Sequence, residues 1–178
     1  MASDTFGGLI LREISPDDSV SGLSLGDDAL LPLKIFLRKH ARRYHTQNTG
    51  KTYVLVYDKN PRQVVAYVTL ICSQVLTESV GRPDGLDGYA HDDFPAIKIA
   101  RLAVDYRHRG KDLGKTLVDW SVGVASGRVM PHVGCRFLIV DSKHGSVGFY
   151  KKQGFQLVNT QHDLEHPLMY LDIGKLPP

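Results

Sequence analysis

The stretch IARLAVDYRHRGKDLGKTLVDWSV, residues 99–122, decides the fold of this 178-residue chain. Ile97 to Val104 is apolar on both faces, which is typical of a central strand. A basic, glycine-containing turn follows. The apolar residues after the turn recur at helical spacing and mark the buried side of a helix that Gly127 can end: Leu113, Leu117, Trp120 and Val124. The stretch therefore predicts a buried strand, a turn and a helix in succession.

The turn between this strand and this helix suits an anion. The first N–H groups of a helix have no intrahelical partner, and the positive end of the helix dipole lies there. Gly110 lets the backbone approach a phosphate closely, and basic side chains surround it: Arg107, Arg109, Lys111 and Lys115. The spacing matches neither the nucleoside-triphosphate loop nor the dinucleotide fingerprint. The turn predicts a phosphate site of another kind, with an ordinary basic surface turn as the alternative.

Downstream of the helix, the pattern predicts three more strands and one more helix. Cys135 to Val140 is an apolar strand, and a helix from about Gly145 to Gln153 stops at Gly154. Two further strands are expected at Phe155 to Val158 and at Leu168 to Ile173.

Upstream, a short strand from Leu9 to Ile14 precedes a helix that Asp27 or Asp28 can cap, with Pro32 in its first turn. One side of this helix is apolar, and the other carries a basic stripe: Lys34, Arg38, Arg42 and His45, with Lys39 and Arg43 alongside. The stripe is either a solvated helix face or a contact for an anionic substrate or nucleic acid.

A hairpin follows, with strands at Thr52 to Tyr57 and Gln63 to Ser73 around the turn Asp58-Lys59-Asn60-Pro61. The loop from Val75 to Pro95, about twenty residues rich in Gly, Asp and Pro, either forms one wall of an acceptor site or is a disordered insertion. The element order predicts an α/β fold around a mixed sheet, in a single domain over residues 1–178.

The composition narrows the class of protein. The chain is 42% hydrophobic and 23% charged with a net charge of +3, which is ordinary for a globular protein and suits an anionic ligand. No apolar run approaches the ~20 residues of a membrane span, and no secretory signal is visible, so we expect a cytoplasmic protein. Cys72 and Cys135 lack zinc-ligand spacing and are expected to be buried free thiols, and no metal site is expected.

Two motifs carry a resemblance to a known family. Arg107-His-Arg-Gly110-Lys-Asp112, preceded by the strand from Ala100 to Asp105, resembles the Gln/Arg-x-x-Gly-x-Gly/Ala signature of GNAT acetyltransferases. Downstream, Gly148-Phe-Tyr150-Lys-Lys-Gln-Gly154-Phe155 is similar to the late Phe-Tyr-x-x-x-Gly-Phe element of that family. The resemblance spans essentially Leu9 to Ile173. It implies a central mixed, mostly antiparallel β-sheet with a splayed central strand pair, flanked by helices.

The resemblance also implies an acyltransferase that uses acetyl-CoA as cosubstrate and a primary amine as acceptor. The pantetheine arm would pair with the backbone of Leu102, Ala103 and Val104, where the N–H of Leu102 or Val104 would stabilise the oxyanion. The pyrophosphate would lie on the turn, whose expected ligands are Arg107, Arg109, Gly110, Lys111, Asp112, Leu113, Gly114 and Lys115. Tyr150 would protonate the departing thiolate, and a packed aromatic is its alternative role.

Two positions depart from the family pattern. Asp112 stands where Gly or Ala is normal, and its carboxylate either competes with the pyrophosphate or points to solvent and caps the helix. The stretch from Asp141 to Ser146 is shortened relative to the family, whose members often carry an Asn or Asp there near the cofactor. Ser146 is the candidate for that cofactor contact in this chain. The sequence does not identify the general base. Every candidate side chain also has a surface or structural explanation, and relatives can deprotonate the amine through water. The candidates are Glu78, His91, Asp92, Asp93 and Arg101.

The acceptor stays open at the level of sequence. Ser24 to Leu30, the basic helix up to Tyr44, Lys51 to Val54 and Phe94 to Val104 loosely resemble the GNAT branch that includes toxins acetylating the amine of aminoacyl-tRNA. Acetylation of a small amine or a protein amino group, and toxin-like acetylation of tRNA, are therefore the enzymatic alternatives. A catalytically degenerate acyl-CoA-binding or partner-binding module and a basic nucleic-acid-binding protein come from other classes. A homodimer is compatible with the resemblance, and no residue specifies its interface.

Overall fold

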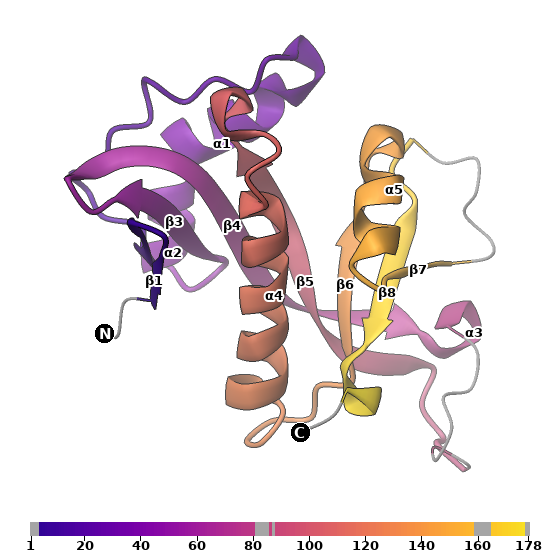
Figure 1. Ribbon diagram of the computed structural model, residues 1–178. Coiled ribbons are helices and arrows are strands. Elements are labelled where there is room, and N and C mark those ends of the chain that lie inside the picture. The colour runs from indigo at the N-terminus through magenta and orange to yellow at the C-terminus, as the bar shows by residue number, and fades with distance from the viewer. Residues whose placement is uncertain (1–3, 81–85, 87, 159–164, 177–178) are drawn as a thin grey trace. The chain divides into compact units, whose positions relative to one another are not determined.

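The computed structural model describes residues 4–80, 86, 88–158 and 165–176. Its strands follow the order β1-β2-β3-β4-β5-β6-β8-β7 in an eight-stranded sheet (Figure 1). Only β5 and β6 pair in parallel among the strand pairs with a described register; the others are antiparallel. The mixed, mostly antiparallel sheet with flanking helices confirms the predicted α/β class, while the splay of its central pair remains a prediction.

Internal contacts divide the chain into two compact units. The first unit comprises Met1–Ile71 and Ala100–Leu117, and the second comprises Cys72–Ile99 and Val118–Pro178. β4 (Asn60–Leu76), β5 (Asp93–Val104) and α4 (Leu113–Val124) each contribute to both units. The organisation as a single functional domain stays a prediction.

The first unit begins with antiparallel strands and a helical segment. Its elements are β1 (Asp4–Phe6), β2 (Leu9–Glu13), the 3-10 turn η1 (Asp28–Leu30), α1 (Leu31–Lys39), α2 (Ala41–Thr46) and β3 (Lys51–Tyr57). The predicted strand at residues 9–14 and the hairpin are present, and β1 is an additional strand. Tyr57 pairs with Asn60, so the hairpin turn is shorter than expected and Asn60 and Pro61 already belong to β4.

The predicted single helix is split. The Asp27 side chain caps the 3-10 turn η1 that leads into α1, accepting a hydrogen bond of 2.8 Å from the N–H of Ala29, and Pro32 lies in the first turn of α1 as expected. The regular helix breaks at His40, where φ is −123°, and α2 starts anew at Ala41. The apolar periodicity continues across the break, so the sequence carried no signal of it.

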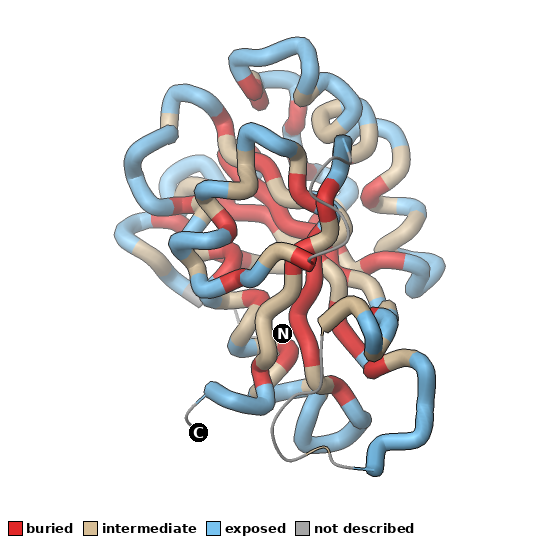
Figure 2. Tube along the Cα trace, turned by 90° about the vertical axis from the view of Figure 1, so that its right-hand side faces the viewer, coloured by how far each residue is buried: buried red, intermediate tan, exposed pale blue. Residues whose placement is uncertain are grey.

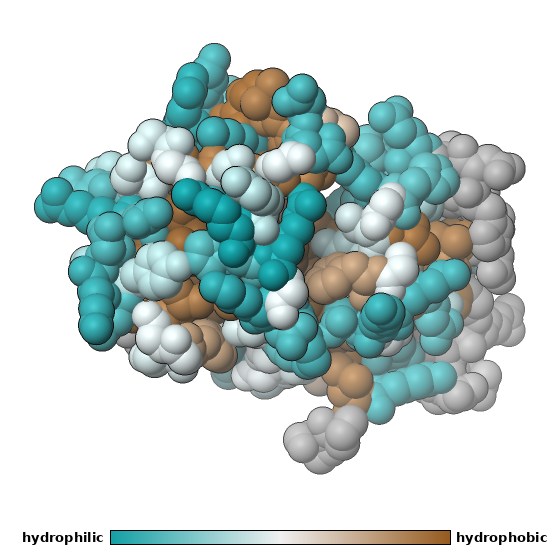
Figure 3. All heavy atoms as spheres, turned by 45° about the horizontal axis from the view of Figure 1, so that its top comes forward, coloured by the Kyte–Doolittle hydropathy of each residue, from teal (hydrophilic) through white to brown (hydrophobic). Residues whose placement is uncertain are grey.

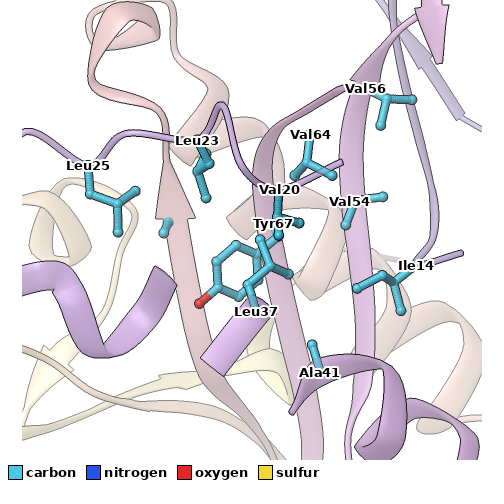
Figure 4. Packing of buried hydrophobic residues seen from close by; sticks show 11 residues of the cluster. Ile14, Val20, Leu23, Leu25, Leu37, Ala41, Val54, Val56, Val64 and Tyr67 are labelled. Atoms are coloured by element: carbon cyan, nitrogen blue, oxygen red, sulfur yellow. The ribbon is translucent and has the colours of Figure 1, made fainter. Parts of the chain in front are cut away.

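A core cluster holds α1 and α2 against β3 and β4 (Figure 4). Leu37 and Ala41 of the helices are fully buried, and the Tyr67 hydroxyl donates to the carbonyl of Leu33 at 2.7 Å. Val54, Val56, Val64, Leu23, Leu25, Val20, Ile14 and Ala103 complete the cluster. Burying each such aliphatic side chain contributes roughly 1.5–3 kcal/mol before entropy costs. The helices therefore cover one face of the β3–β4 hairpin, and three side chains of the segment at 20–25 are buried in the same cluster.

In the second unit, β6 (Phe137–Asp141) pairs with the neighbouring part of β5, and β8 (Leu168–Asp172) pairs with β6 and with β7 (Gln156–Leu157). The helix α5 (His144–Lys152) lies between β6 and β7 in sequence, and Gly154, at φ +87°, follows it as predicted. Buried residues follow the strands in Figure 2, while exposed ones mark turns and helix surfaces. On the face seen in Figure 3, hydrophilic side chains predominate and hydrophobic ones reach the surface in smaller groups.

Three predictions about the second unit need correction. The loop expected at residues 75–95 is shorter at both ends, because β4 continues to Leu76, the short helix α3 follows at Thr77–Val80 and β5 begins at Asp93; residues 81–85 and 87 lie outside the described residues. Gly127 does not end the helix but lies within a π-helical turn, Ala125–Val129, that extends α4. Cys72 is exposed, since β4 is only partly covered beyond residue 70, whereas Cys135 is buried as expected.

Candidate active site

Asp105, directly after β5, organises the basic turn in the first unit. Its side chain is 1% exposed and accepts hydrogen bonds from the backbone N–H groups of Ser24 and Arg107, each at 3.0 Å. It caps the 3-10 turn η2 (Tyr106–His108), and the N–H of Tyr106 returns a bond to the carbonyl of Ser24 at 2.8 Å. Because Arg107 donates to it, the pKa of the Asp105 carboxyl lies far below its usual range. A buried carboxylate therefore anchors the turn to the segment around residue 24.

The two arginines predicted to meet the pyrophosphate are engaged with the protein. Arg107 binds Asp105 through Nε at 2.8 Å and Nη2 at 2.6 Å, and Nη2 also donates to the carbonyl of Gly22 at 2.6 Å. Arg109 donates from Nη2 to the carbonyl of Leu25 at 2.8 Å. Both side chains thus hold the segment at 22–25 beside the turn.

The backbone of the turn contains two residues with positive φ. Gly110 has φ +77° and Asp112 has φ +54°, in the left-handed region that favours glycine. The first helical bond of α4 runs from the N–H of Thr116 to the carbonyl of Asp112 at 2.9 Å. The N–H groups of Leu113 and Gly114 precede this bond and so have no acceptor within the helix. Lys111 and Lys115 are exposed on the same turn.

Tyr57 and His108 form a second support for the turn. The Tyr57 hydroxyl is hydrogen-bonded to Nε2 of His108, whose side chain is 12% exposed. The other ring nitrogen, Nδ1, lies 3.8 Å from the Asp105 carboxylate, too far for a hydrogen bond. β3 and the turn are therefore connected through one imidazole.

The predicted pantetheine residues end β5 in the same unit. Ala103 is buried in the core cluster, and Leu102 and Val104 are half-buried. The N–H of Asp105, next along the chain, donates to the carbonyl of Val65 in β4 at 2.8 Å. The structure thus gathers in one unit all of the predicted coenzyme ligands except one: Leu102, Ala103, Val104, Arg107, Arg109, Gly110, Lys111, Asp112, Leu113, Gly114 and Lys115.

The remaining ligand, Ser146, and the predicted catalytic Tyr150 lie on α5 in the second unit. Tyr150 is 6% exposed, and its ring packs edge-on against Phe149 and Phe155 with centroids at 5.0 and 5.4 Å. Burial raises the pKa of the Tyr150 hydroxyl above its ordinary value of 10. The side chain is therefore protonated at neutral pH, as a proton donor must be, although the same packing also suits a structural aromatic.

The candidate bases remain distributed. Glu78, His91 and Asp92 are exposed in the second unit, and Asp93 accepts a bond from Gln74 at 3.1 Å. Arg101 belongs to the first unit and lies over the ring of Phe36 at 5.3 Å. In the described part of the chain, no group of three or more His, Cys, Asp or Glu side chains gathers as metal ligands would.

The basic stripe of the N-terminal helix divides into two sets. Arg42 donates to the carbonyls of Ser15, at 3.1 Å, and Asp18, and His45 meets Glu13 at 3.2 Å. These two residues connect α2 to the last residue of β2 and to the segment that follows it. The exposed members are Arg38, Lys39 and Arg43, so only part of the stripe is available to a ligand.

Sequence reasoning missed the roles of Asp105, Tyr57 and His108. Asp105 lies inside the recognised stretch, and a carboxylate directly after an apolar strand and before a basic turn could have signalled a cap. Tyr57 lies in a hairpin 51 residues away from His108, and no local pattern connects them.

Over the described residues, no helix combines the length and apolar character that crossing a bilayer would need.

Comparison with known proteins places this geometry in a family. The model of the acetyltransferase (GNAT) domain matches residues 49–157. A tRNA-acetylating toxin of Mycobacterium tuberculosis is 28% identical over 150 residues, covering 84% of this chain and 85% of that protein.

Solved structures share the fold. AtaT complexed with acetyl-methionyl-tRNAfMet has a TM-score of 0.81 at 23% identity, covering 93% of this chain and 95% of that one. A tyrosine-to-phenylalanine mutant of KacT gives 0.81 at 24% identity, with 94% and 96% covered. AtaTR bound with acetyl-CoA gives 0.76 at 24% identity, with 95% and 96% covered. The signature turn after a buried strand, the late tyrosine motif, and a domain match over more than half of the chain lead to one conclusion: the protein belongs to the GNAT family of acetyltransferases.

Proposed function

We propose that this acetyltransferase moves the acetyl group of acetyl-CoA to the α-amine of an aminoacyl-tRNA. The observation that carries the proposal is the likeness to the tRNA-acetylating toxin, which extends over 84% of this chain. The exposed cations Arg38, Lys39 and Arg43 on α1 and α2 support it, because phosphates of an RNA backbone are bound electrostatically.

The coenzyme would be held in the first unit. The open N–H groups at the start of α4, the left-handed turn at Gly110 and the exposed Lys111 suit a diphosphate. Leu102 to Val104 would pair with the amide groups of the pantetheine arm. Arg107 and Arg109 contribute positive charge while they hold the turn in shape. Asp112 opposes binding only if its carboxylate faces the phosphates.

The transfer is a direct attack. The deprotonated amine nitrogen forms a bond to the thioester carbonyl carbon, and the resulting oxyanion is stabilised by the N–H of Leu102 or Val104. The carbon–sulfur bond then breaks, and the thiolate takes the proton of the Tyr150 hydroxyl. The amine proton leaves through water, so no dedicated base is needed. Because burial raises the pKa of Tyr150, its hydroxyl group is protonated at neutral pH and can donate this proton.

Incubation with radiolabelled acetyl-CoA and a pool of aminoacylated tRNAs tests the proposal. We expect label in acid-precipitable tRNA, lost after mild alkaline deacylation, and thiol release in equal amount. Tyr150→Phe should lower kcat by about 10²–10⁴-fold with little change in acetyl-CoA affinity, whereas Tyr89→Phe on an exposed tyrosine should change neither. Equal losses of turnover and affinity would contradict the general-acid role. A thermal shift with acetyl-CoA but no thiol release with any amine would instead identify a binding module.

A further inference from the structure

Aromatic rings and arginines gather on α1, α2 and the end of β5, all within the first unit. Phe36 lies 5.7 Å from Tyr44, edge to face, and 6.4 Å from His40. Arg101 covers the ring of Phe36 at 5.3 Å, and Arg43 lies over the ring of Tyr44 at 5.5 Å. We call these five residues the aromatic–arginine cluster.

The two arginines of the cluster are exposed and uncommitted to carboxylates. In the part of the chain that the structure describes, neither Arg43 nor Arg101 forms an ion pair. By contrast, Arg12 binds the buried Asp18, and Arg107 binds the buried Asp105. These two arginines therefore pair with buried carboxylates, whereas the guanidinium groups of Arg43 and Arg101 lie over aromatic rings.

The position of the cluster relates it to the expected thioester arm. Arg101 and Ala103 project from the same face of β5, since alternate residues of a strand share a face. Ala103 packs with Leu37 and Ala41, so this is the face that α1 and α2 cover. The residue between them, Leu102, is one of the two proposed oxyanion donors. A group resting on Arg101 would therefore lie beside the place where the acceptor amine must arrive.

Aromatic rings alternating with guanidinium planes are what proteins use to hold unpaired nucleotides. Bases stack on both kinds of plane, and the cations neutralise the adjoining phosphates. We propose that the aromatic–arginine cluster binds the single-stranded 3′ nucleotides of the tRNA acceptor end, with a base stacked on the outer face of the Arg101 guanidinium and a phosphate near Arg43. This inference rests on the proposed function and names the part of the substrate that this side of the site takes.

Binding of the trinucleotide CCA, labelled with a fluorophore at its 5′ end, tests the cluster directly by anisotropy at low salt. Arg101→Lys keeps the charge and removes the planar stacking surface, and Phe36→Leu keeps apolar volume and removes the ring beneath it. Each should weaken CCA binding about tenfold to hundredfold, the range of a lost base stack. Arg62→Lys, on an exposed arginine of β4 outside the cluster, is the matched control and should bind like the wild type. Arg101→Lys alters only an exposed side chain, so the test survives if Phe36→Leu fails to fold.

The outcomes separate this inference from the proposed function. Wild-type protein that binds CCA through the cluster but acetylates no aminoacyl-tRNA would refute the proposed function and leave the nucleotide site standing. Aminoacyl-tRNA acetylation that is unaffected by both cluster variants, or CCA binding that they leave unchanged, would overturn the inference. Displacement of CCA by an acidic peptide at equal concentration would also overturn it, since charge alone would then explain the binding. Unchanged acetyl-CoA affinity in Arg101→Lys is expected and would exclude a general disturbance of the fold.

Discussion

Replacing Asp105 tests the construction of the coenzyme turn most directly. In Asp105→Ala, the N–H groups of Ser24 and Arg107 lose their acceptor and the Arg107 guanidinium loses its counter-ion. An unsatisfied buried donor costs about 1–3 kcal/mol, and breaking a buried charge pair about 3–5 kcal/mol. Because the Arg107 side chain is 47% exposed and can be rehydrated, we expect the low end, about 3 kcal/mol of unfolding free energy.

Asp105→Asn refines the measurement, since it keeps one acceptor oxygen and removes the charge. We expect a loss of about 1–2 kcal/mol at pH 7. The native pKa of Asp105 is lowered, so its stabilisation is fully present above the unfolded value of about 3.9 and is lost as the pH falls toward the native value. The stabilities of the wild type and Asp105→Asn should therefore converge below about pH 4.

Urea denaturation at a series of pH values, followed by tryptophan fluorescence, provides the assay, with Asp17→Ala on an exposed carboxylate as control. The control should stay within about 0.5 kcal/mol of the wild type. A loss below about 1 kcal/mol in Asp105→Ala, or a gap between the wild type and Asp105→Asn that is independent of pH, would refute the reasoning that this carboxylate anchors the turn.

Four more expectations concern the turn and the tyrosine. Gly110 has φ +77° with open space around an added Cβ, so Gly110→Ala should lower the free energy of unfolding by only about 1 kcal/mol. It should also weaken acetyl-CoA binding, measured by calorimetry; an affinity equal to that of the wild type would mean that the phosphates bind elsewhere. Asp112→Asn should tighten acetyl-CoA if the carboxylate faces phosphate, and Asp112→Gly should add up to about 1 kcal/mol of stability by relieving φ +54°; equal affinities would mean that the side chain faces solvent. Tyr57→Phe removes the hydrogen bond to His108 and should lower the free energy of unfolding by about 0.5–1.5 kcal/mol, measured in urea. An unchanged stability would mean that this hydrogen bond does not support the turn. Because burial raises the pKa of Tyr150, kcat should show no decline from its ionisation up to pH 9, and a basic limb that disappears in Tyr150→Phe would contradict this.

Much of the fold could be predicted from the sequence, because its strongest patterns are local. Apolar runs and a glycine predict the strand, basic turn and helix from Ile97 to Val124, and the structure contains these elements. The end of α5 at Gly154 followed from the same reasoning. The predicted ends of two long strands were wrong near residues 75–95. The Gly, Asp and Pro residues there indicated a loop, whereas the extent of both strands is set by tertiary contacts.

The candidate site was predictable as a segment and not as a network. The residues of the turn were identified, but Arg107 and Arg109 were expected to point at phosphates, and they also bind carbonyls 85 and 84 residues away. Neither spacing nor propensity encodes such partners. The same limit applies to the cluster at Phe36, whose contact with Arg101 exists only once α1 lies beside β5.

The hydrogen bond from the N–H of Ser24 to the Asp105 carboxylate joins positions 81 residues apart, and this has a consequence during synthesis. The segment at 22–25 can therefore bond to the turn only after the ribosome has released the chain beyond Arg109, because its partners are Asp105, Arg107 and Arg109. Co-translational folding of the first unit thus cannot finish with its N-terminal elements alone; this attachment forms only after the whole of β5 has been synthesised.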